Sequence, residues 1–175
     1  AWRLKDHDGA EALAASYAAA SAVGFADVLR ALPPEARSEV ADVVRFLADR
    51  AYKEQRIDHS RDLNHVIACL LDSADAWNNY AFLCRETKQF DDAYAGYQHA
   101  LEKEPDSPQL WNDAAVILHF HQPTPANLAR ARTMYEHALA LADQQLADAS
   151  SSALVRDRAT RAREDARRNL LEMPK

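Results

Sequence analysis

The stretch that decides the fold is ADAWNNYAFLCRETKQFDDAYAGYQHALEKEPDS, residues 74–107. Large side chains and alanines recur in this stretch at helical spacing: Trp77, Tyr80, Ala81, Cys84, Phe90, Ala93, Tyr97, Ala100 and Leu101. Pro105 follows the last of them. Large side chains fill gaps between two helices, whereas alanines allow the helices to approach closely. The pattern predicts a helix over residues 74–87, a turn at residues 87–89 and a second helix over residues 90–104.

The same pattern begins again after Pro108. Trp111 lies 34 residues after Trp77, and Ala114, Ala115 and Leu118 keep the spacing of the first unit. In the second half of the unit, the distance between equivalent positions increases from 34 to 38 residues, because Ala131 and Tyr135 correspond to Ala93 and Tyr97. Four residues are therefore inserted, and we place them in the turn between the two helices, within HFHQPTPAN at residues 119–127.

A helix–turn–helix unit with a period of about 34 residues resembles the tetratricopeptide repeat family. The resemblance implies an all-α, right-handed α–α superhelix. It divides the chain into an N-terminal helical region (residues 1–73, a degenerate repeat or cap), a first repeat (74–107), a second repeat with a loop insertion (108–145) and a C-terminal capping helix (146–175).

The segments outside the two repeats also carry helical periodicity. Apolar residues predict a helix over residues 9–32, a second over residues 34–54 that starts at Pro34, and a short one from residue 63 to residue 72. Residues 150–152 are three serines, one of which is a plausible N-cap for the last helix. That helix has a polar outer face, as the end of a solenoid requires.

Composition excludes several classes of function. The net charge is −6, and residues 74–143 carry 10 acidic and 5 basic groups, which argues against a nucleic-acid surface. Only three glycines occur, so phosphate-binding loops lack their turn residues. No stretch approaches the roughly 20 apolar residues of a membrane span. Cys69 and Cys84 are expected to be buried free thiols, and we expect a cytoplasmic protein.

Catalytic and metal-binding patterns are weak. His119 and His121 are two residues apart, so on one helix they point to different faces and cannot chelate together. Asp62 and His65 form a single carboxylate-x-x-His motif, whereas di-iron bundles need two copies and further glutamates. Neither cysteine has a basic neighbour that would lower its pKa. We expect no enzyme activity, no metal and no cofactor.

The tetratricopeptide resemblance implies that the first helices of the repeats line a concave groove for a partner. Helical spacing assigns eight candidate partner-binding residues to that face: Asn78, Asn79, Phe82, Arg85, Asn112, Asp113, Val116 and His119. The same mapping adds Gln109 and Phe120, and the last helix would offer Asp165, Arg168 and Asn169 if it closes the groove. Alternatively, Phe82 and Val116 pack under the terminal helices.

The expected function is a non-enzymatic protein-interaction module that binds a protein or peptide segment. Chaperone-tail binding is disfavoured, because the positions that would hold a lysine and an asparagine one turn apart are occupied by Asn78 and Phe82. The alternative is a domain that self-associates or docks within a longer protein. No nucleic acid is expected as a partner.

Overall fold

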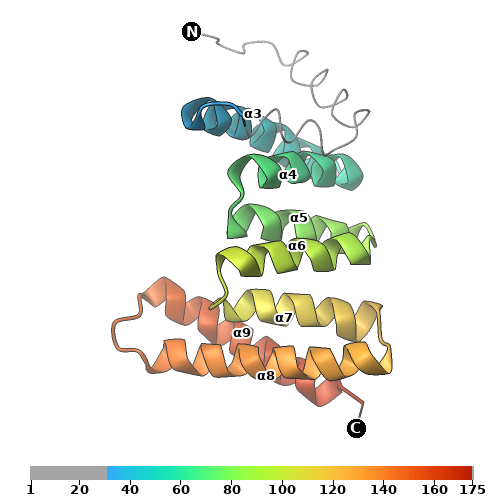
Figure 1. The fold of residues 1–175 in the computed structure, drawn as a ribbon, viewed down its shortest axis with the longest axis vertical. Helices are drawn as coiled ribbons and strands as arrows, with labels where there is room; N and C mark the ends of the chain where they lie inside the picture. The colour runs from blue at the N-terminus through green and yellow to red at the C-terminus, as the bar shows by residue number, and fades with distance from the viewer. Residues whose placement is uncertain (1–30, 175) are drawn as a thin grey trace. The chain divides into compact units, whose positions relative to one another are not determined.

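The structure is a computed structural model that describes residues 31–174. Every regular element in this part is helical, which confirms the all-α prediction (Figure 1). The elements are α3 (Pro34–Lys53), α4 (Ile57–Leu71), α5 (Ala74–Glu86), α6 (Phe90–Lys103), α7 (Pro108–Val116), the π-helical segment η1 (Ile117–His121), α8 (Pro125–Ala147) and α9 (Ala153–Glu172). The helix expected at residues 9–32 falls almost wholly outside the described residues.

The chain divides into two compact units, residues 1–87 and residues 88–175. In the first unit, α3 packs on α4 and α4 packs on α5. Leu47 of α3 and Leu63 and Ile67 of α4 are buried, and the buried Ser60 hydroxyl donates a hydrogen bond to the Ala48 carbonyl oxygen at 3.0 Å. This bond joins α4 to α3 and satisfies a hydroxyl that would otherwise be costly to bury.

The junction between α4 and α5 is fixed by local hydrogen bonds. Asp72 ends α4 in the left-handed conformation (φ 47°), a region that Asp tolerates better than most residues. Its carboxylate accepts a hydrogen bond from the Trp77 indole Nε1 at 3.0 Å. Ser73 caps α5 by accepting a hydrogen bond from the Ala76 N–H. These contacts set the start of α5 at the residue that the sequence predicts.

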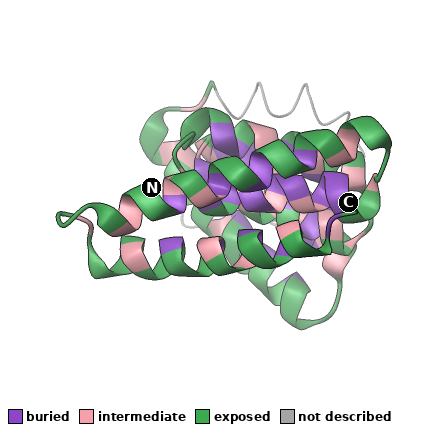
Figure 2. Ribbon diagram, turned by 90° about the horizontal axis from the view of Figure 1, so that it is seen from below, coloured by how far each residue is buried: buried purple, intermediate pink, exposed green. Residues whose placement is uncertain are grey.

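In the second unit, α7 occupies a central position, because it packs against α6, α8 and α9. Tyr97 of α6, Ile117 of η1 and Tyr135 of α8 are among the largest fully buried side chains. Figure 2 shows the buried residues as stripes along one side of the helices, with exposed residues on the other side. The amphipathic spacing in the sequence therefore corresponds to a real difference in exposure.

The four-residue insertion is not in the turn, and this part of the prediction is wrong. The turn between η1 and α8 has three residues, 122–124, as does the turn between α5 and α6 at residues 87–89. One extra residue is accommodated in the helix that comprises α7 and η1, where the backbone widens to a π-helix over Ile117–His121. The other three extend the start of α8, because Thr124 caps the helix and Pro125 occupies its first turn.

The last helix, α9, packs on α8 and α7 (Figure 1). Ala159, Ala162 and Ala166 of α9 are buried, as are Ala138 and Ala142 of α8. These small side chains allow a close approach of the helices. Ser152 is the N-cap of α9 and accepts a hydrogen bond from the Val155 N–H, so the serine triplet does supply the expected cap.

Candidate functional site: a pocket between α7 and α9

The predicted partner-binding residues are distributed over both units. Asn78, Asn79, Phe82 and Arg85 lie on α5 in the first unit, whereas Asn112, Asp113, Val116 and His119 lie on α7 and η1 in the second. On α5, Asn79 is exposed and Phe82 is 37% exposed. The Arg85 guanidinium carbon lies 5.0 Å from the centre of the Phe82 ring, a cation–π arrangement. This face of α5 thus presents an aromatic ring partly covered by a charged group.

Asn112 and His119 do not face solvent, contrary to the sequence prediction. Asn112 is only 5% exposed, because α9 packs over this part of α7. The Asn169 side-chain amide donates a hydrogen bond to the Asn112 carbonyl oxygen at 3.0 Å. His119 is 7% exposed, and its Nδ1 lies 3.3 Å from the Tyr135 hydroxyl oxygen of α8. Both side chains therefore connect helices within the unit.

The surroundings of His119 favour its neutral form. Burial lowers the pKa of His119, the nearby Arg132 lowers it further, and Glu172 acts in the opposite direction. Burial also raises the pKa of Tyr135, so its hydroxyl stays protonated. A neutral imidazole and a protonated phenol can share one hydrogen bond in this apolar setting. The pair is an internal polar contact next to the π-helical segment.

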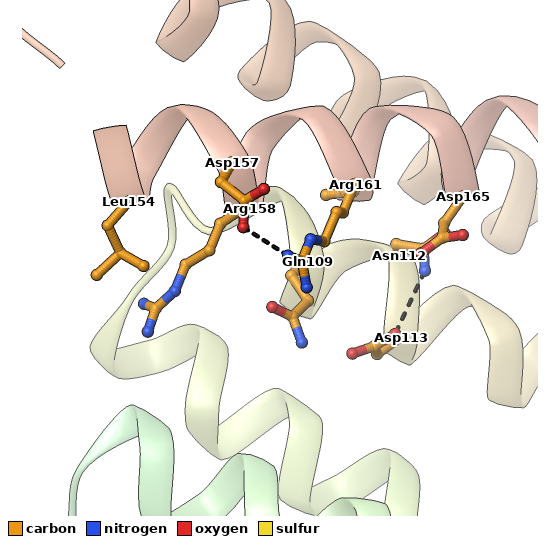
Figure 3. A pocket seen from close by; sticks show the side chains of 9 residues that line it. Gln109, Asn112, Asp113, Leu154, Asp157, Arg158, Arg161 and Asp165 are labelled. Atoms are coloured by element: carbon orange, nitrogen blue, oxygen red, sulfur yellow. Dashed lines mark hydrogen bonds and ion pairs between the residues drawn. The ribbon is translucent and has the colours of Figure 1, made fainter. Parts of the chain in front are cut away.

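A pocket of about 340 Å³ lies between α7 and α9. Its lining residues come from one side of α7 and from one face of α9: Gln109, Asn112, Asp113, Leu154, Asp157, Arg158, Arg161, Ala162 and Asp165. Figure 3 shows Leu154, Arg158 and Arg161 extending from α9 into the pocket, with Gln109 opposite them. We call this site the α7–α9 pocket.

Charged side chains dominate the wall that α9 contributes. Arg161 forms an ion pair with Asp157 at 2.8 Å (Figure 3). Asp165 forms an ion pair with Arg168, which does not line the pocket. Arg158 is exposed and forms no hydrogen bond or ion pair with the residues of the 31–174 range. On α7, the Asn112 amide donates a hydrogen bond to the Asp113 carboxylate at 3.3 Å. The pocket thus contains both charge signs.

Sequence mapping found part of this pocket and missed the rest. Gln109, Asn112, Asp113 and Asp165 were all expected on the groove face. Leu154, Asp157, Arg158, Arg161 and Ala162 were not expected there. A usable signal was present, because these residues recur at three- and four-residue steps and so share one face of a helix. The sequence analysis instead assigned the polar face of this helix to the solvent-exposed end of a solenoid.

The remaining histidine pattern has a structural explanation. The His121 ring stacks on Phe90 of α6, with ring centres 4.2 Å apart, and the neighbouring Gln122 amide donates to the Asp91 carboxylate. The end of η1 is thereby held against the start of α6. Across residues 31–174, no group of three or more His, Cys, Asp or Glu side chains is placed to hold a metal ion. None of the helices in that range combines the length and the hydrophobicity that crossing a membrane requires.

Comparison with known proteins gives one result that bears on these helices. Residues 74–117, which include α5, α6, α7 and the first residue of η1, match a family model described as a tetratricopeptide repeat. The match begins at the first residue of α5 and contains both Trp77 and Trp111. The comparison with curated protein sequences found no match.

Proposed function

We propose that this chain is an interaction module that holds a peptide segment of a protein partner in the α7–α9 pocket, and the match of residues 74–117 to a tetratricopeptide repeat supports this proposal. Repeats of this family generally mediate contacts between proteins. The observation that carries the proposal is the pocket itself, a hollow of about 340 Å³ whose walls come from two helices packed on each other. Its volume lies at the lower end of the range of about 300–1,000 Å³ that is typical of binding sites.

The lining chemistry favours binding over catalysis. The pocket has no serine, cysteine, histidine or lysine among its lining residues, so it lacks the usual nucleophiles and the commonest general base. It does offer the side-chain amide of Gln109 and an apolar side chain at Leu154, which is 60% exposed. The Gln109 amide can form hydrogen bonds with a peptide backbone, and the leucine can cover an apolar side chain of the partner.

The α5 face supplies a second candidate contact. Phe82 is partly exposed beside Arg85, and Asn78 and Asn79 lie one turn before them on the same helix. Aromatic and arginine side chains are enriched among residues that contribute most to protein interfaces. We therefore retain these four residues of α5 as proposed partner contacts, whereas Asn112 and His119 act within the unit.

A peptide selection tests the proposal directly. Phage-displayed random peptides are selected on the full chain, and the dissociation constants of the selected peptides are measured by fluorescence polarisation. Gln109→Trp should fill the pocket and weaken binding by about tenfold or more, a loss of roughly 1.4 kcal/mol. The matched control is Gln144→Trp, because Gln144 is an exposed glutamine of α8 that does not line the pocket.

The outcomes separate the alternatives. Failure to select any peptide, or equal affinity of Gln109→Trp and the unmodified protein, contradicts the proposal. Self-association is tested by light scattering at micromolar concentration. A dimer that Gln109→Trp converts to a monomer would mean that a second copy of the chain occupies the pocket in place of a peptide partner.

A further inference from the structure

Arg158 differs from the other charged side chains that line the α7–α9 pocket. It is exposed and forms no hydrogen bond or ion pair with residues 31–174. The other four charged side chains of the lining each interact with another residue of the chain: Asp113, Asp157, Arg161 and Asp165. One guanidinium group of the pocket therefore remains available to a ligand.

Gln109 of α7 lies across the pocket from Arg158 (Figure 3). Its side chain is exposed and forms no hydrogen bond with any of the described residues. Gln109 also lies in the first turn of α7, which contains no acidic residue and carries partial positive charge from its free N–H groups. This contribution alone would not define a site, but it has the same sign as the charge of Arg158. A guanidinium and an amide that both remain free can donate hydrogen bonds to one carboxylate.

Leu154 places an apolar surface beside these polar groups. It is four residues before Arg158, so the two side chains share one face of α9, and Leu154 is 60% exposed. Figure 3 shows both side chains extending from α9 on the same side. The pocket thus offers a cation, an amide donor and an apolar contact to the same ligand.

The spacing of Leu154 and Arg158 matches the spacing of side chains in an extended peptide. Four residues of an α-helix span about 6 Å along its axis. In an extended chain, successive side chains point to opposite sides, so side chains two residues apart lie on the same side, separated by about 6.6 Å. One turn of a helix, about 10 Å across and about 5.4 Å long, needs more room than the pocket of about 340 Å³ provides. These dimensions favour an extended segment over a helix.

We propose that the α7–α9 pocket selects an extended peptide segment with an acidic and an apolar side chain two residues apart. The carboxylate of the segment pairs with Arg158 and accepts a hydrogen bond from Gln109, and the apolar side chain packs on Leu154. This proposal rests on the proposed function, because it specifies the chemistry of the segment that the same pocket holds. The ion pair gives selectivity for acidic segments, and the spacing determines which side chain of the segment meets the leucine.

The test uses peptide pools with an uncharged fluorophore at the N-terminus, an amidated C-terminus and small uncharged residues at all positions except two. One fixed position carries glutamate, and a leucine is fixed one, two or four residues away, in both orders. Matched pools replace the glutamate by glutamine. The glutamate pool with a spacing of two should bind the full chain about fivefold more tightly than its glutamine counterpart, which corresponds to about 1 kcal/mol for an exposed ion pair. It should also bind more tightly than the pools with spacings of one or four. Raising the salt from about 50 mM to about 500 mM should reduce the preference for glutamate.

Charge reversal at Arg158 identifies the group that selects glutamate. Arg158→Glu should abolish the preference for glutamate over glutamine and create a preference for a pool with lysine at that position. Arg167→Glu is the matched control, because Arg167 is an exposed arginine of α9 outside the pocket lining. A preference for glutamate that survives Arg158→Glu would overturn the assignment. Circular dichroism confirms that each variant folds.

Two further substitutions test the other contacts. Leu154→Ser should reduce the preference for leucine over serine at the apolar position, whereas Leu171→Ser should not, because Leu171 is an 82% exposed leucine of α9 that does not line the pocket. Gln109→Leu removes the amide at similar size and should weaken the binding of the glutamate pool more than that of the glutamine pool. An equal loss for the two pools would show that Gln109 does not hold the carboxylate.

The results distinguish failure of this inference from failure of the proposed function. Equal binding of the glutamate and glutamine pools, combined with weaker binding to Gln109→Trp, would overturn the inference and leave peptide binding in the pocket intact. Tightest binding at a spacing of four would indicate a helical segment and would overturn the extended arrangement. No binding of any pool, together with an unsuccessful phage selection, would overturn the proposed function itself.

Discussion

The Asn169 side-chain amide donates a hydrogen bond to the Asn112 side-chain oxygen at 3.0 Å, and both residues are buried. The two asparagines are 57 residues apart in the sequence and join α9 to α7. A hydrogen bond between two buried amides has a definite geometry that apolar contacts lack, so it fixes how the alanine face of α9 sits on its neighbours. The same contact removes Asn112 from the surface available to a partner.

Replacing Asn169 by alanine should therefore destabilise the protein. The change leaves the buried oxygen of Asn112 without this donor, and the expected loss is about 1–3 kcal/mol in the free energy of unfolding. Urea denaturation followed by circular dichroism measures it. Arg167→Ala, at an exposed position on the same helix, should change stability by less than about 0.5 kcal/mol.

A double-mutant cycle with Asn112→Ala isolates the contact between the two amides. If the two asparagines act as one unit, the double variant should lose less stability than the sum of the two single losses. Additive losses would mean that the two residues stabilise the fold independently. The sequence places Asn112 on the face that a partner would contact, whereas its burial predicts a loss of stability for Asn112→Ala.

The two tryptophans of the repeats should respond differently to truncation. Trp77 is 8% exposed and donates a hydrogen bond to Asp72, so Trp77→Ala should cost about 3–5 kcal/mol. Trp111 is only partly buried; it contacts His137 edge to face and donates to the Pro105 carbonyl oxygen at 2.7 Å. Trp111→Ala should cost less than about 3 kcal/mol. Equal losses in urea denaturation would contradict this ranking.

Stability should fall when the pH drops below the pKa of a free histidine, because burial lowers the pKa of His119. In the unfolded chain the ring takes up a proton near pH 6.5, so between that value and the lower folded pKa the unfolded state binds more protons. The free energy of unfolding should therefore decrease from about pH 7.5 to about pH 5.5.

His119→Gln should reduce this pH dependence. Hydrogen bonds from Arg50 and Arg56 lower the pKa of Glu54, and hydrogen bonds from Ser150 lower the pKa of Asp148. These two carboxylates lose their contributions to the free energy of unfolding only at more acidic pH, below about 4. An identical pH profile for His119→Gln and the unmodified protein would show that another group is responsible.

Phe82→Glu tests the α5 face. Because the ring is partly exposed, the substitution should leave the helical circular dichroism signal and the melting temperature close to those of the unmodified protein. We expect it to weaken the binding of a protein partner about tenfold or more if Phe82 is an interface anchor. Tyr52→Glu on α3 is the control, since Tyr52 is also an exposed aromatic residue of the first unit. Unchanged affinity of Phe82→Glu would remove α5 from the proposed interface.

Elements that depend on local patterns could be predicted from the sequence. α5 and α6 begin at the residues that the spacing of Trp77, Tyr97 and the alanines indicated, because amphipathic periodicity and the turn at residues 87–89 act within a few residues. The serine cap of α9 was predictable for the same reason. The sequence placed the insertion in the turn, whereas Thr124 and Pro125 start α8 early and η1 widens to a π-helix. An offset between two repeats does not reveal which element contains the extra residues.

The candidate site was less predictable because it depends on a contact over a long sequence distance. Whether Asn112 faces solvent is decided by where Asn169 docks, and nothing in the residues around Asn112 specifies this. The burial of His119 likewise depends on Tyr135 of the next helix. Gln109 and Asp113, which the sequence places on the same face of the helix, lie on the side of α7 that remains open at the pocket.

The position of α9 also has a thermodynamic consequence. One face of this helix carries Ala159 and Ala166, buried within the unit, and the adjoining face carries Leu154, Arg158 and Arg161, which form a wall of the pocket. A ligand that binds only when this wall is in place stabilises the folded state by mass action, by about 2.7 kcal/mol at a hundred times its dissociation constant. Substitutions that loosen the packing of α9 should in turn lower the affinity for the ligand, even where the substituted residue does not contact the ligand. Ligand binding and the attachment of the last helix are then linked equilibria, and either can be used to measure the other.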